Sequence, residues 1–261
     1  MGETIRLERI DETAVLTLNR PRAYNAFDLP MVQDLADFLV TLAGDQTVRA
    51  VVVTGEPPAF SAGGDLRWAS AWPAGPGAAF TELSARFHVA IQTIRRMPQP
   101  VIAAVNGPAA GGGFSLALAA DFRVMDEKAE MRQAFTSNGL SMDGGATFSL
   151  PRLVGLARAL EIAAFDEPIP AAKALAWGLV TRVAPSGWAL NLALDMARDL
   201  GQRASVGWFW SKTLLTDSLA TTFETQTERE RWGLKSAALS PEGREGLAAF
   251  TEKRPPVFRN R

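Results

Sequence analysis

Two glycine-containing loops are the first segments of this chain whose composition could support catalysis. The loop 61–65 (SAGGD) follows the apolar run 48–54, and the loop 111–113 (GGG) follows the apolar run 101–105. Each loop precedes a predicted helix, and the first N–H groups of a helix lack an intrahelical partner and carry a partial positive charge. Because glycine lets a ligand approach the backbone closely, two such loops facing each other could hold one developing oxyanion between two N–H donors.

The simplest alternative for each loop is a tight turn that binds nothing. Two nucleotide-binding interpretations are excluded by spacing. After Gly111, a G-x-G-x-x-G motif requires a glycine at the position that Leu116 occupies, and no Gly-Lys-Ser/Thr sequence of a P-loop follows. The loops therefore favour either turns or an oxyanion site, and their spacing alone does not decide between the two.

The surrounding pattern predicts the elements that must position these loops. Ile5–Ile10 and Ala14–Asn19 flank a polar pair as the strands of a hairpin do, and Asp28 precedes a stripe of helical spacing as an N-cap. The runs 48–54 and 101–105 are typical of buried strands, and apolar residues between 80 and 94 repeat every three or four positions, as in an amphipathic helix. From residue 189 onward the pattern is helical, which predicts an α/β protein with a C-terminal helical region.

Composition narrows the possible functions. The 261 residues include no cysteine and one histidine, which excludes a disulfide scaffold, a cysteine nucleophile and a multi-histidine metal site. The 27 basic and 28 acidic residues give a net charge of −1 and no electrostatic case for nucleic acid or an anionic membrane. The first ten residues lack the apolar segment of a signal peptide, and the apolar stretch 100–120 is interrupted by Asn106, three glycines and Ser115. We therefore expect a cytoplasmic protein without a metal site.

Several segments, in order along nearly the whole chain, resemble the crotonase superfamily, which is the enoyl-CoA hydratase/isomerase family. They are NRPRAYNAFD (19–28), AFSAGGDL (59–66), QPVIAAVNGPAAGGGFSLALAADFRV (99–124), GLSMDGGATFSLPRLVG (139–155), AKALAWGLVTRV (172–183) and GLAAFTEKRPPVF (246–258). The resemblance implies the α/β fold of this superfamily, a crotonase-like spiral of β-β-α units with a C-terminal helical region.

The resemblance also implies an organisation and a class of substrate. Residues 1–195 would form the acyl-CoA-binding core, and residues 196–261 would form a helical region for trimerisation and CoA contact. The expected partners are an acyl-CoA thioester substrate and further copies of the chain, in a homotrimer or a dimer of trimers. No separate cofactor is expected, because coenzyme A is part of the substrate.

The oxyanion donors implied by the family pattern are the N–H groups of Gly64 and Gly112, which would polarise a thioester carbonyl and stabilise an enolate or a tetrahedral adduct. The family's hydratases also carry two glutamates as general acid and base. Ser115 and Phe135 stand at those positions here, and neither can hold a water as a carboxylate does. Hydration by the two-glutamate mechanism is therefore not expected.

Asp143 matches the isomerase branch of the family. One carboxylate near the α and γ carbons of an enoyl thioester can remove a proton and return it elsewhere. Leu140 and Met142 would raise its basicity by desolvation. The alternative is that Asp143, which stands just before two glycines and an apolar run, only caps a helix. We expect an enoyl-CoA isomerase in which Asp143 moves the proton.

His88 is the single histidine and lies beside Phe87 at the edge of an apolar helical stripe, where a packing or surface role is the plain alternative. In 4-chlorobenzoyl-CoA dehalogenase, a relative in this superfamily, a histidine falls at this spacing and the nucleophilic aspartate matches Asp143. There the aspartate attacks the aromatic ring and the histidine activates the water that hydrolyses the ester. This chain departs from that pattern, since Phe135 replaces the tryptophan that orients the aspartate. A dehalogenase-like or hydrolase-like enzyme remains an alternative.

Two further alternatives are a serine hydrolase and a non-catalytic acyl-CoA-binding relative. Residues 113–117 (GFSLA) approach the motif G-x-S-x-G, and His88 and Asp143 could complete a triad with Ser115. The last glycine of the motif is missing, however, and the histidine precedes the serine. A binding protein would take up CoA thioesters without turnover.

The family pattern also suggests contacts with CoA. The backbone C=O of Ala62 would face the adenine, and Arg22 and Arg67 could pair with phosphates, because a guanidinium group suits that geometry. Phe250 and Lys253 match C-terminal contacts that are often contributed across a subunit interface. Each charged side chain could equally be a solvated surface group.

Overall fold

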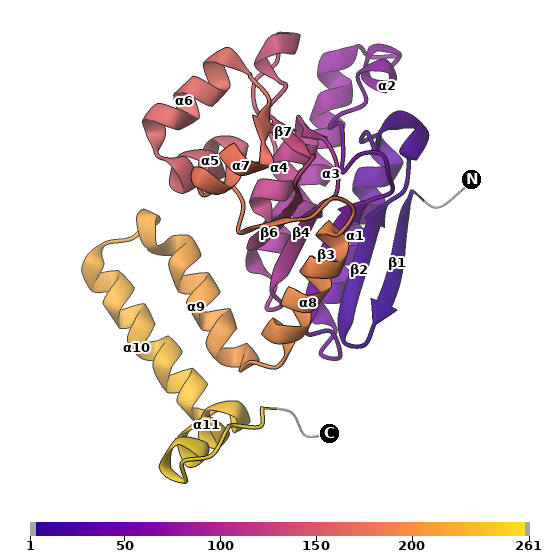
Figure 1. The fold of residues 1–261 in the computed structure, drawn as a ribbon. Helices are drawn as coiled ribbons and strands as arrows, with labels where there is room; N and C mark the ends of the chain where they lie inside the picture. Colours follow the sequence, from indigo (N-terminus) through magenta and orange to yellow (C-terminus); the bar gives the residue numbers. More distant parts are fainter. Residues whose placement is uncertain (1–3, 259–261) are drawn as a thin grey trace.

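A six-stranded sheet forms the centre of the protein, whose computed structural model describes residues 4–258 (Figure 1). The strand order is β1-β2-β3-β4-β6-β9, with β1 antiparallel to β2 and every other pair parallel. β2, β3 and β4 are buried along their whole length, as expected for parallel strands covered on both faces. The bounds are β1 Ile5–Ile10, β2 Thr13–Leu18, β3 Ala50–Gly55, β4 Val101–Val105, β6 Phe122–Asp126 and β9 Arg182–Ala184.

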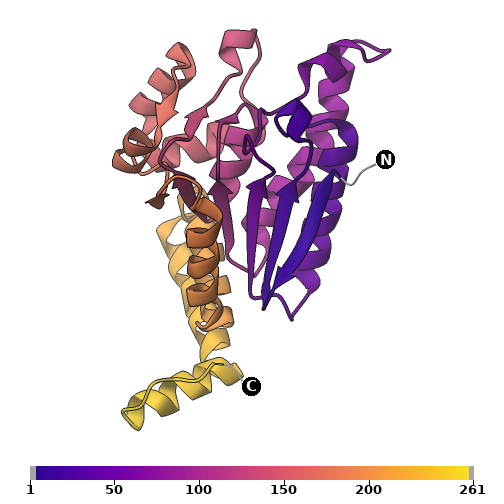
Figure 2. The ribbon, with the colours of Figure 1, turned by 45° about the vertical axis from the view of Figure 1, so that its right-hand side comes forward.

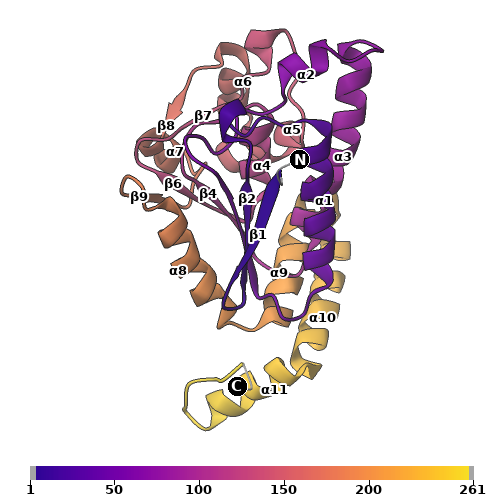
Figure 3. The same cartoon turned by 90° about the vertical axis from the view of Figure 1, so that its right-hand side faces the viewer.

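Helices cover both faces of this sheet. α1 (Leu29–Gly44) and α3 (Pro76–Arg96) pack together on one face, and α8 (Ala189–Gly201) lies on the other (Figure 3). Asp28 accepts a hydrogen bond from the Met31 N–H at 3.1 Å, so the predicted N-cap of α1 is confirmed. The predicted hairpin and buried strands are confirmed as β1, β2, β3 and β4.

The segment 68–79 is rich in proline, glycine and alanine, a composition typical of a surface loop. In the structure α2 (Leu66–Ser70) enters it and α3 begins inside it at Pro76, so only residues 71–75 lie outside a helix. Asp65 caps α2 by accepting from the Trp68 N–H at 3.1 Å, and the Trp68 and Trp72 rings pack 4.9 Å apart. A helix cap and an aromatic pair thus order a segment whose composition favours a loop.

A second layer extends from the carboxyl ends of β3 and β4. It contains a three-stranded sheet of order β5-β7-β8 and the helices α4 to α7. The predicted fold class, an α/β crotonase-like spiral of β-β-α units with a C-terminal helical region, is confirmed. The bounds are β5 Ala109–Ala110, β7 Glu130–Arg132, β8 Ile169–Pro170, α4 Gly112–Ala119, α5 Ala146–Val154, α6 Leu156–Phe165 and α7 Ala171–Ala176.

The last three helices form an arm, which we define as residues 205–258 and which contains α9 (Ser205–Asp217), α10 (Phe223–Leu239) and α11 (Pro241–Thr251) (Figure 2). α8 spans the predicted boundary at residue 195 and packs on the sheet, so the arm begins only at α9. The arm exposes a set of large apolar side chains: Leu215, Leu219, Phe223, Trp232, Leu234, Leu239, Leu247 and Phe250. Between residues 4 and 258, no helix is long and apolar enough to cross a membrane.

Candidate functional site

The two glycine loops touch each other because they follow adjacent parallel strands, β3 and β4. The Ala110 N–H donates to the Ser61 carbonyl at 2.8 Å, which joins the loops. Gly63 has a φ of +86°, and a Cβ there would lie 2.6 Å from the Gly112 nitrogen. Only glycine permits this approach, so the sequence SAGGD brings position 64 close to position 112.

Within the described residues, the amides of Gly64 and Gly112 both lack a protein acceptor. Phe27 bridges to the first loop by donating to the Gly63 carbonyl at 2.6 Å and by accepting from Asp65 at 2.9 Å, and this pairing leaves out the Gly64 N–H. Gly112 is the first residue of α4, where an N–H has no intrahelical partner. Among the hydrogen bonds of residues 4–258, neither amide is a donor.

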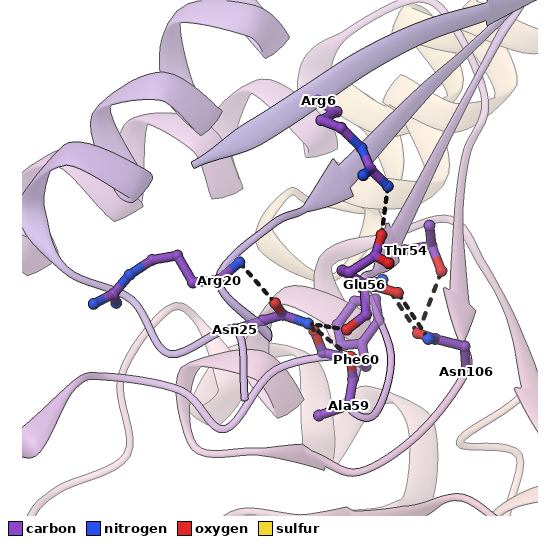
Figure 4. A network of polar contacts seen from close by, with 9 residues as sticks. Arg6, Arg20, Asn25, Thr54, Glu56, Ala59, Phe60 and Asn106 are labelled. Carbon is purple, nitrogen blue, oxygen red and sulfur yellow. Dashed lines mark hydrogen bonds and ion pairs between the residues drawn. The ribbon is translucent and has the colours of Figure 1, made fainter. Parts of the chain in front are cut away.

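A buried polar network fixes the segment that leads into the first loop (Figure 4). Asn25 is fully buried, and its Nδ2 donates to the carbonyls of Glu56 and Ala59 at 2.8 Å each, while its Oδ1 accepts from the Arg20 N–H at 2.9 Å. On the other side, Asn106 donates to the Gly55 carbonyl at 2.7 Å. The side-chain amides of Asn25 and Asn106 thus bind the backbone carbonyls at both ends of the turn after β3. These hydrogen bonds fix the main chain that leads into the first loop.

A cavity of about 430 Å³ opens in front of the two loops. Four phenylalanines form much of its wall, and the rings of Phe27 and Phe87 pack 5.1 Å apart. The polar groups in the wall are few, which is typical of a small-molecule site. The lining residues are Phe27, Ala62, Gly64, Leu66, Phe80, Leu83, Ser84, Phe87, Gly111, Gly112, Ala134, Phe135, Asn138, Leu140, Ser141, Met142 and Asp143.

Asp143 is the one carboxylate in this wall, and two side chains of α3 hold it. Ser84 donates its hydroxyl to Oδ2 at 2.7 Å, and His88 Nε2 contacts Oδ1 at 2.7 Å. Because an ionised carboxylate only accepts hydrogen bonds, the imidazole donates in this pair. About 38% of the Asp143 side chain remains exposed, so the carboxylate is oriented and still accessible.

The expectation that apolar neighbours raise the basicity of Asp143 was wrong in its net result. Burial does raise the pKa of Asp143, but hydrogen bonds from Ser84, from the Gly144 N–H and from His88 outweigh it, so the pKa lies below its usual range. Asp143 is therefore ionised at neutral pH. A carboxylate of low basicity can take a proton from carbon only where the negative charge left on the ligand is itself stabilised.

The backbone around Asp143 explains how the residue reaches the cavity. Ser115, in α4, donates its hydroxyl to the Asp143 carbonyl at 2.7 Å. Gly144 has a φ of +64°, and a Cβ there would lie 2.5 Å from Phe87 and 2.9 Å from Ser115. The N-cap of α5 is Gly145, with no side-chain hydrogen bond, so the alternative of Asp143 as a helix cap was wrong.

Ser84 is a residue that the sequence analysis missed. It stands four positions before His88 in α3, and residues at that spacing share one face of a helix. A serine one turn before the single histidine was the available signal. Its meaning depends on Asp143, which lies 59 positions later in the chain.

The serine-hydrolase alternative is not supported by the geometry. Ser115 is about 1% exposed, and its hydroxyl is directed at the carbonyls of Asp143 and Gly111. His88 contacts Asp143 and makes no hydrogen bond to Ser115 within residues 4–258. The three side chains are close in space but do not form a nucleophile–base–acid relay.

The predicted CoA contacts fall into two groups. Ala62 lines the cavity. The side chains of Arg22 and Arg67 are exposed, with Arg22 in the turn 21–23 and Arg67 in α2, directly after the first glycine loop. Phe250 and Lys253 belong to the end of the arm, which lies away from α2 in all three views (Figures 1–3). The chain therefore gathers the first group around one site, and the second group could reach such a site only in another copy. Across residues 4–258, no cluster of histidine and carboxylate side chains could hold a metal ion.

Comparisons with known proteins agree with this architecture. The enoyl-CoA hydratase/isomerase family model matches residues 8–261. The 1,2-epoxyphenylacetyl-CoA isomerase of Escherichia coli (strain K12) is 35% identical over 93% of each chain. The 4-chlorobenzoyl coenzyme A dehalogenase-2 of Arthrobacter sp. is 32% identical over 95% of this chain and 91% of its own. The crystal structure of an enoyl-CoA hydratase from Polaromonas sp. JS666 superposes with a TM-score of 0.92 at 36% identity, covering 97% of this chain and 98% of that one.

Proposed function

Because the chain belongs to the enoyl-CoA hydratase/isomerase family, we propose that it shifts the double bond of an enoyl-CoA thioester by proton transfer through a thioester enolate. One observation carries this proposal. The carboxylate of Asp143 lines the same cavity as Gly64 and Gly112, while Ser115 and Phe135 provide no second carboxylate.

In the proposed reaction, the N–H groups of Gly64 and Gly112 donate to the thioester oxygen of a 3-enoyl-CoA. Asp143 takes a proton from C2, and the electron pair of that C–H bond spreads over a dienolate whose negative charge gathers on the oxygen. Asp143 then returns the proton to C4, so the double bond moves from C3–C4 to C2–C3. The two amides supply the larger part of the stabilisation, because charge develops on the atom they contact.

The aromatic wall of the cavity supports an apolar acyl group as the substrate. Phe27, Phe80, Phe87 and Phe135 face the space in front of the amide pair. The ionised state of Asp143 fits a base that must be ready at neutral pH. Its low basicity requires that the enolate be well stabilised, which is the role we assign to the two amides.

The test combines 3-enoyl-CoA with the enzyme in deuterated water. We expect the conjugated 2-enoyl product to form with deuterium exchange at C2. Asp143→Asn should lower turnover by about 10²–10⁴-fold, the range typical of general acid–base catalysis, and the exposed Asp199→Asn should not. A wild type that neither moves the double bond nor exchanges deuterium rules out an isomerase, and if it still binds CoA thioesters it is a non-catalytic relative.

A second candidate is a hydrolytic dehalogenation, favoured by the 2.7 Å contact between His88 Nε2 and Asp143 Oδ1. Asp143 would attack the halogen-bearing ring carbon of an aroyl-CoA, and halide would leave. His88 would take a proton from the water that attacks the resulting ester, so one oxygen of Asp143 ends in the product. Halide release from a 4-halobenzoyl-CoA, with solvent ¹⁸O entering Asp143 in a single turnover, would favour this reaction over isomerisation.

We also propose that the arm docks on further copies of the chain in a homotrimer or a dimer of trimers. Its exposed apolar side chains include Phe223, Trp232 and Phe250, and clusters of this kind mark protein interfaces. Sedimentation of the full chain should give three or six copies. Removal of the chain after residue 222 keeps the Lys212–Asp121 pair and should give a monomer, and a trimer that survives this truncation contradicts the proposal.

A further inference from the structure

A second polar hollow lies at the opposite end of α4 from Gly112. Its volume is about 180 Å³, which corresponds to about six water molecules at about 30 Å³ each. Its wall contains Arg95 of α3, Arg123 of β6, Ser149 and Arg152 of α5, and Thr216 of α9. It shares no lining residue with the 430 Å³ cavity, and the eight residues of α4 separate the two by about 12 Å.

The three arginines of this hollow, Arg95, Arg123 and Arg152, form no ion pair within residues 4–258. The negative charge of Asp121 acts on Arg95 and Arg123 without pairing with either. Asp121, the one acid in the wall, accepts from Lys212 and from the Val101 N–H, both at 2.8 Å. The hollow therefore contains an excess of positive charge.

Asp217, which follows Thr216 of the wall, is shared between two arginines outside the hollow. Asp217 pairs with Arg96 at 2.9 Å and with Arg229 at 2.7 Å. Burial lowers the pKa of Arg95, and the positive charges of Arg96 and Arg152 lower it further, while the negative charges of Asp217 and Asp121 act in the opposite direction and do not outweigh them. The guanidinium groups repel one another and would gain from a shared anion.

Several hydrogen-bond donors in the wall are also unused. Arg123 is 6% exposed, and its Nε and Nη1 each donate to a backbone carbonyl at 2.6 Å, which leaves Nη2 without an acceptor in the described chain. The hydroxyl of Ser149, a residue only 8% exposed, and that of Thr216 make no hydrogen bond among residues 4–258. None of these atoms is sealed inside the protein, so a small ligand in the hollow could reach them.

The aromatic ring of Phe148 holds two of the arginines in place. The guanidinium carbon of Arg152 lies 3.4 Å from the ring centroid and that of Arg95 lies 4.7 Å from it. Arg152 Nη1 also donates to the Phe148 carbonyl at 2.8 Å. Groups that are already fixed lose little side-chain entropy when they bind a ligand.

We propose that this hollow binds a small tetrahedral oxyanion of the phosphate class, either free phosphate or the phosphate of a monoester. Guanidinium groups donate two parallel hydrogen bonds to a phosphate, and the serine and threonine hydroxyls add neutral donors. The site is distinct from the proposed catalytic cavity and is open to a ligand independently of acyl-CoA.

The experiment titrates the full chain with inorganic phosphate in a phosphate-free buffer at constant ionic strength, by calorimetry and by thermal unfolding. We expect saturable heat and a rise in Tm that an equal ionic strength of chloride does not produce. Arg152→Gln should weaken binding about tenfold or more, because it removes charged hydrogen bonds, and Ser149→Ala should weaken it a few-fold. Arg182→Gln removes the same charge from an exposed position outside the hollow and should bind as the wild type does.

A parallel titration with glycerol phosphate separates the two sources of the ligand. Equal affinity indicates a site for phosphate monoesters, and binding of phosphate alone indicates the free anion. If phosphate gives no saturable heat, or if Arg152→Gln and Arg182→Gln bind it equally, the proposal is wrong. If phosphate does not bind and Arg152→Gln instead breaks the oligomer, a carboxylate of another copy fills the hollow and the proposal is again wrong.

Discussion

Two aspartates, Asp121 and Asp143, lie near opposite ends of α4, and their surroundings shift their pKa values in opposite directions. About 14% of the Asp121 side chain is exposed, and burial raises its pKa despite the ion pair with Lys212. Asp143 is partly open, and hydrogen bonds from Ser84, Gly144 and His88 lower its pKa despite burial. The first carboxylate is bound in a buried pair that joins α9 to the core, and the second is held by hydrogen-bond donors with a face left to the cavity. A carboxylate that exchanges a proton with a substrate must be oriented by hydrogen bonds and must also remain accessible from the cavity, as Asp143 is.

The largest effect that separates the two aspartates is on turnover. Asp143→Asn keeps the shape of the side chain and should lower double-bond migration by about 10²–10⁴-fold, with unfolding by urea changed only slightly. The measurement is kcat on 3-enoyl-CoA beside the urea midpoint. An Asp143→Asn protein that turns over normally but unfolds more readily would give Asp143 the structural role that we assign to Asp121.

The next effect is on stability. Lys212→Met leaves Asp121 buried without its partner, and loss of one member of a buried pair costs about 3–5 kcal/mol. The free energy of unfolding should fall by that amount, while kcat per folded molecule stays within about twofold, since neither residue lines the catalytic cavity. Lys128→Met, at an exposed position, is the control. Equal urea midpoints for the two variants would show that the pair is not structural.

A smaller effect concerns the pH at which activity is lost. Asp143 must be ionised to accept a proton, so turnover falls as pH drops through its pKa, and any stability that the lowered pKa confers is lost in the same acidic range. Ser84→Ala removes one hydrogen bond that lowers this pKa, so the acid limb of the kcat profile should move to higher pH. Ser211→Ala, whose hydroxyl bonds only its own helix, should leave the limb in place. An unmoved limb in Ser84→Ala contradicts the positioning role of Ser84.

The smallest effect is expected at His88. His88→Gln retains a donor for Asp143 but cannot act as a base at neutral pH. Isomerisation by Asp143 should then fall only a few-fold, as measured by the rise of the conjugated product. A loss as large as that of Asp143→Asn would mean that His88 moves protons itself, which favours the hydrolytic candidate.

The sequence predicted those features that depend on local pattern. The Asp28 cap, the helical stripe after it and the buried strands before both glycine loops all appear where spacing placed them. Features that depend on distant pairs could not be read in this way. Ser84 gains its meaning from Asp143, and Lys212 from Asp121, which lies 91 positions earlier. The net pKa of Asp143 was missed for the same reason, since apolar neighbours were visible in the sequence and the donors across the cavity were not.

The direct contact between Gly63 and Gly112 has one more consequence. Because the two amides that face the cavity belong to the main chain of loops following hydrogen-bonded strands, their separation is inherited from the spacing of the sheet. We expect that the side chains at positions 84, 88 and 143 can then be exchanged without disturbing that separation. Strand geometry would thus set how the two amides meet the carbonyl oxygen of the proposed substrate, and the side chains around them would determine which reaction follows.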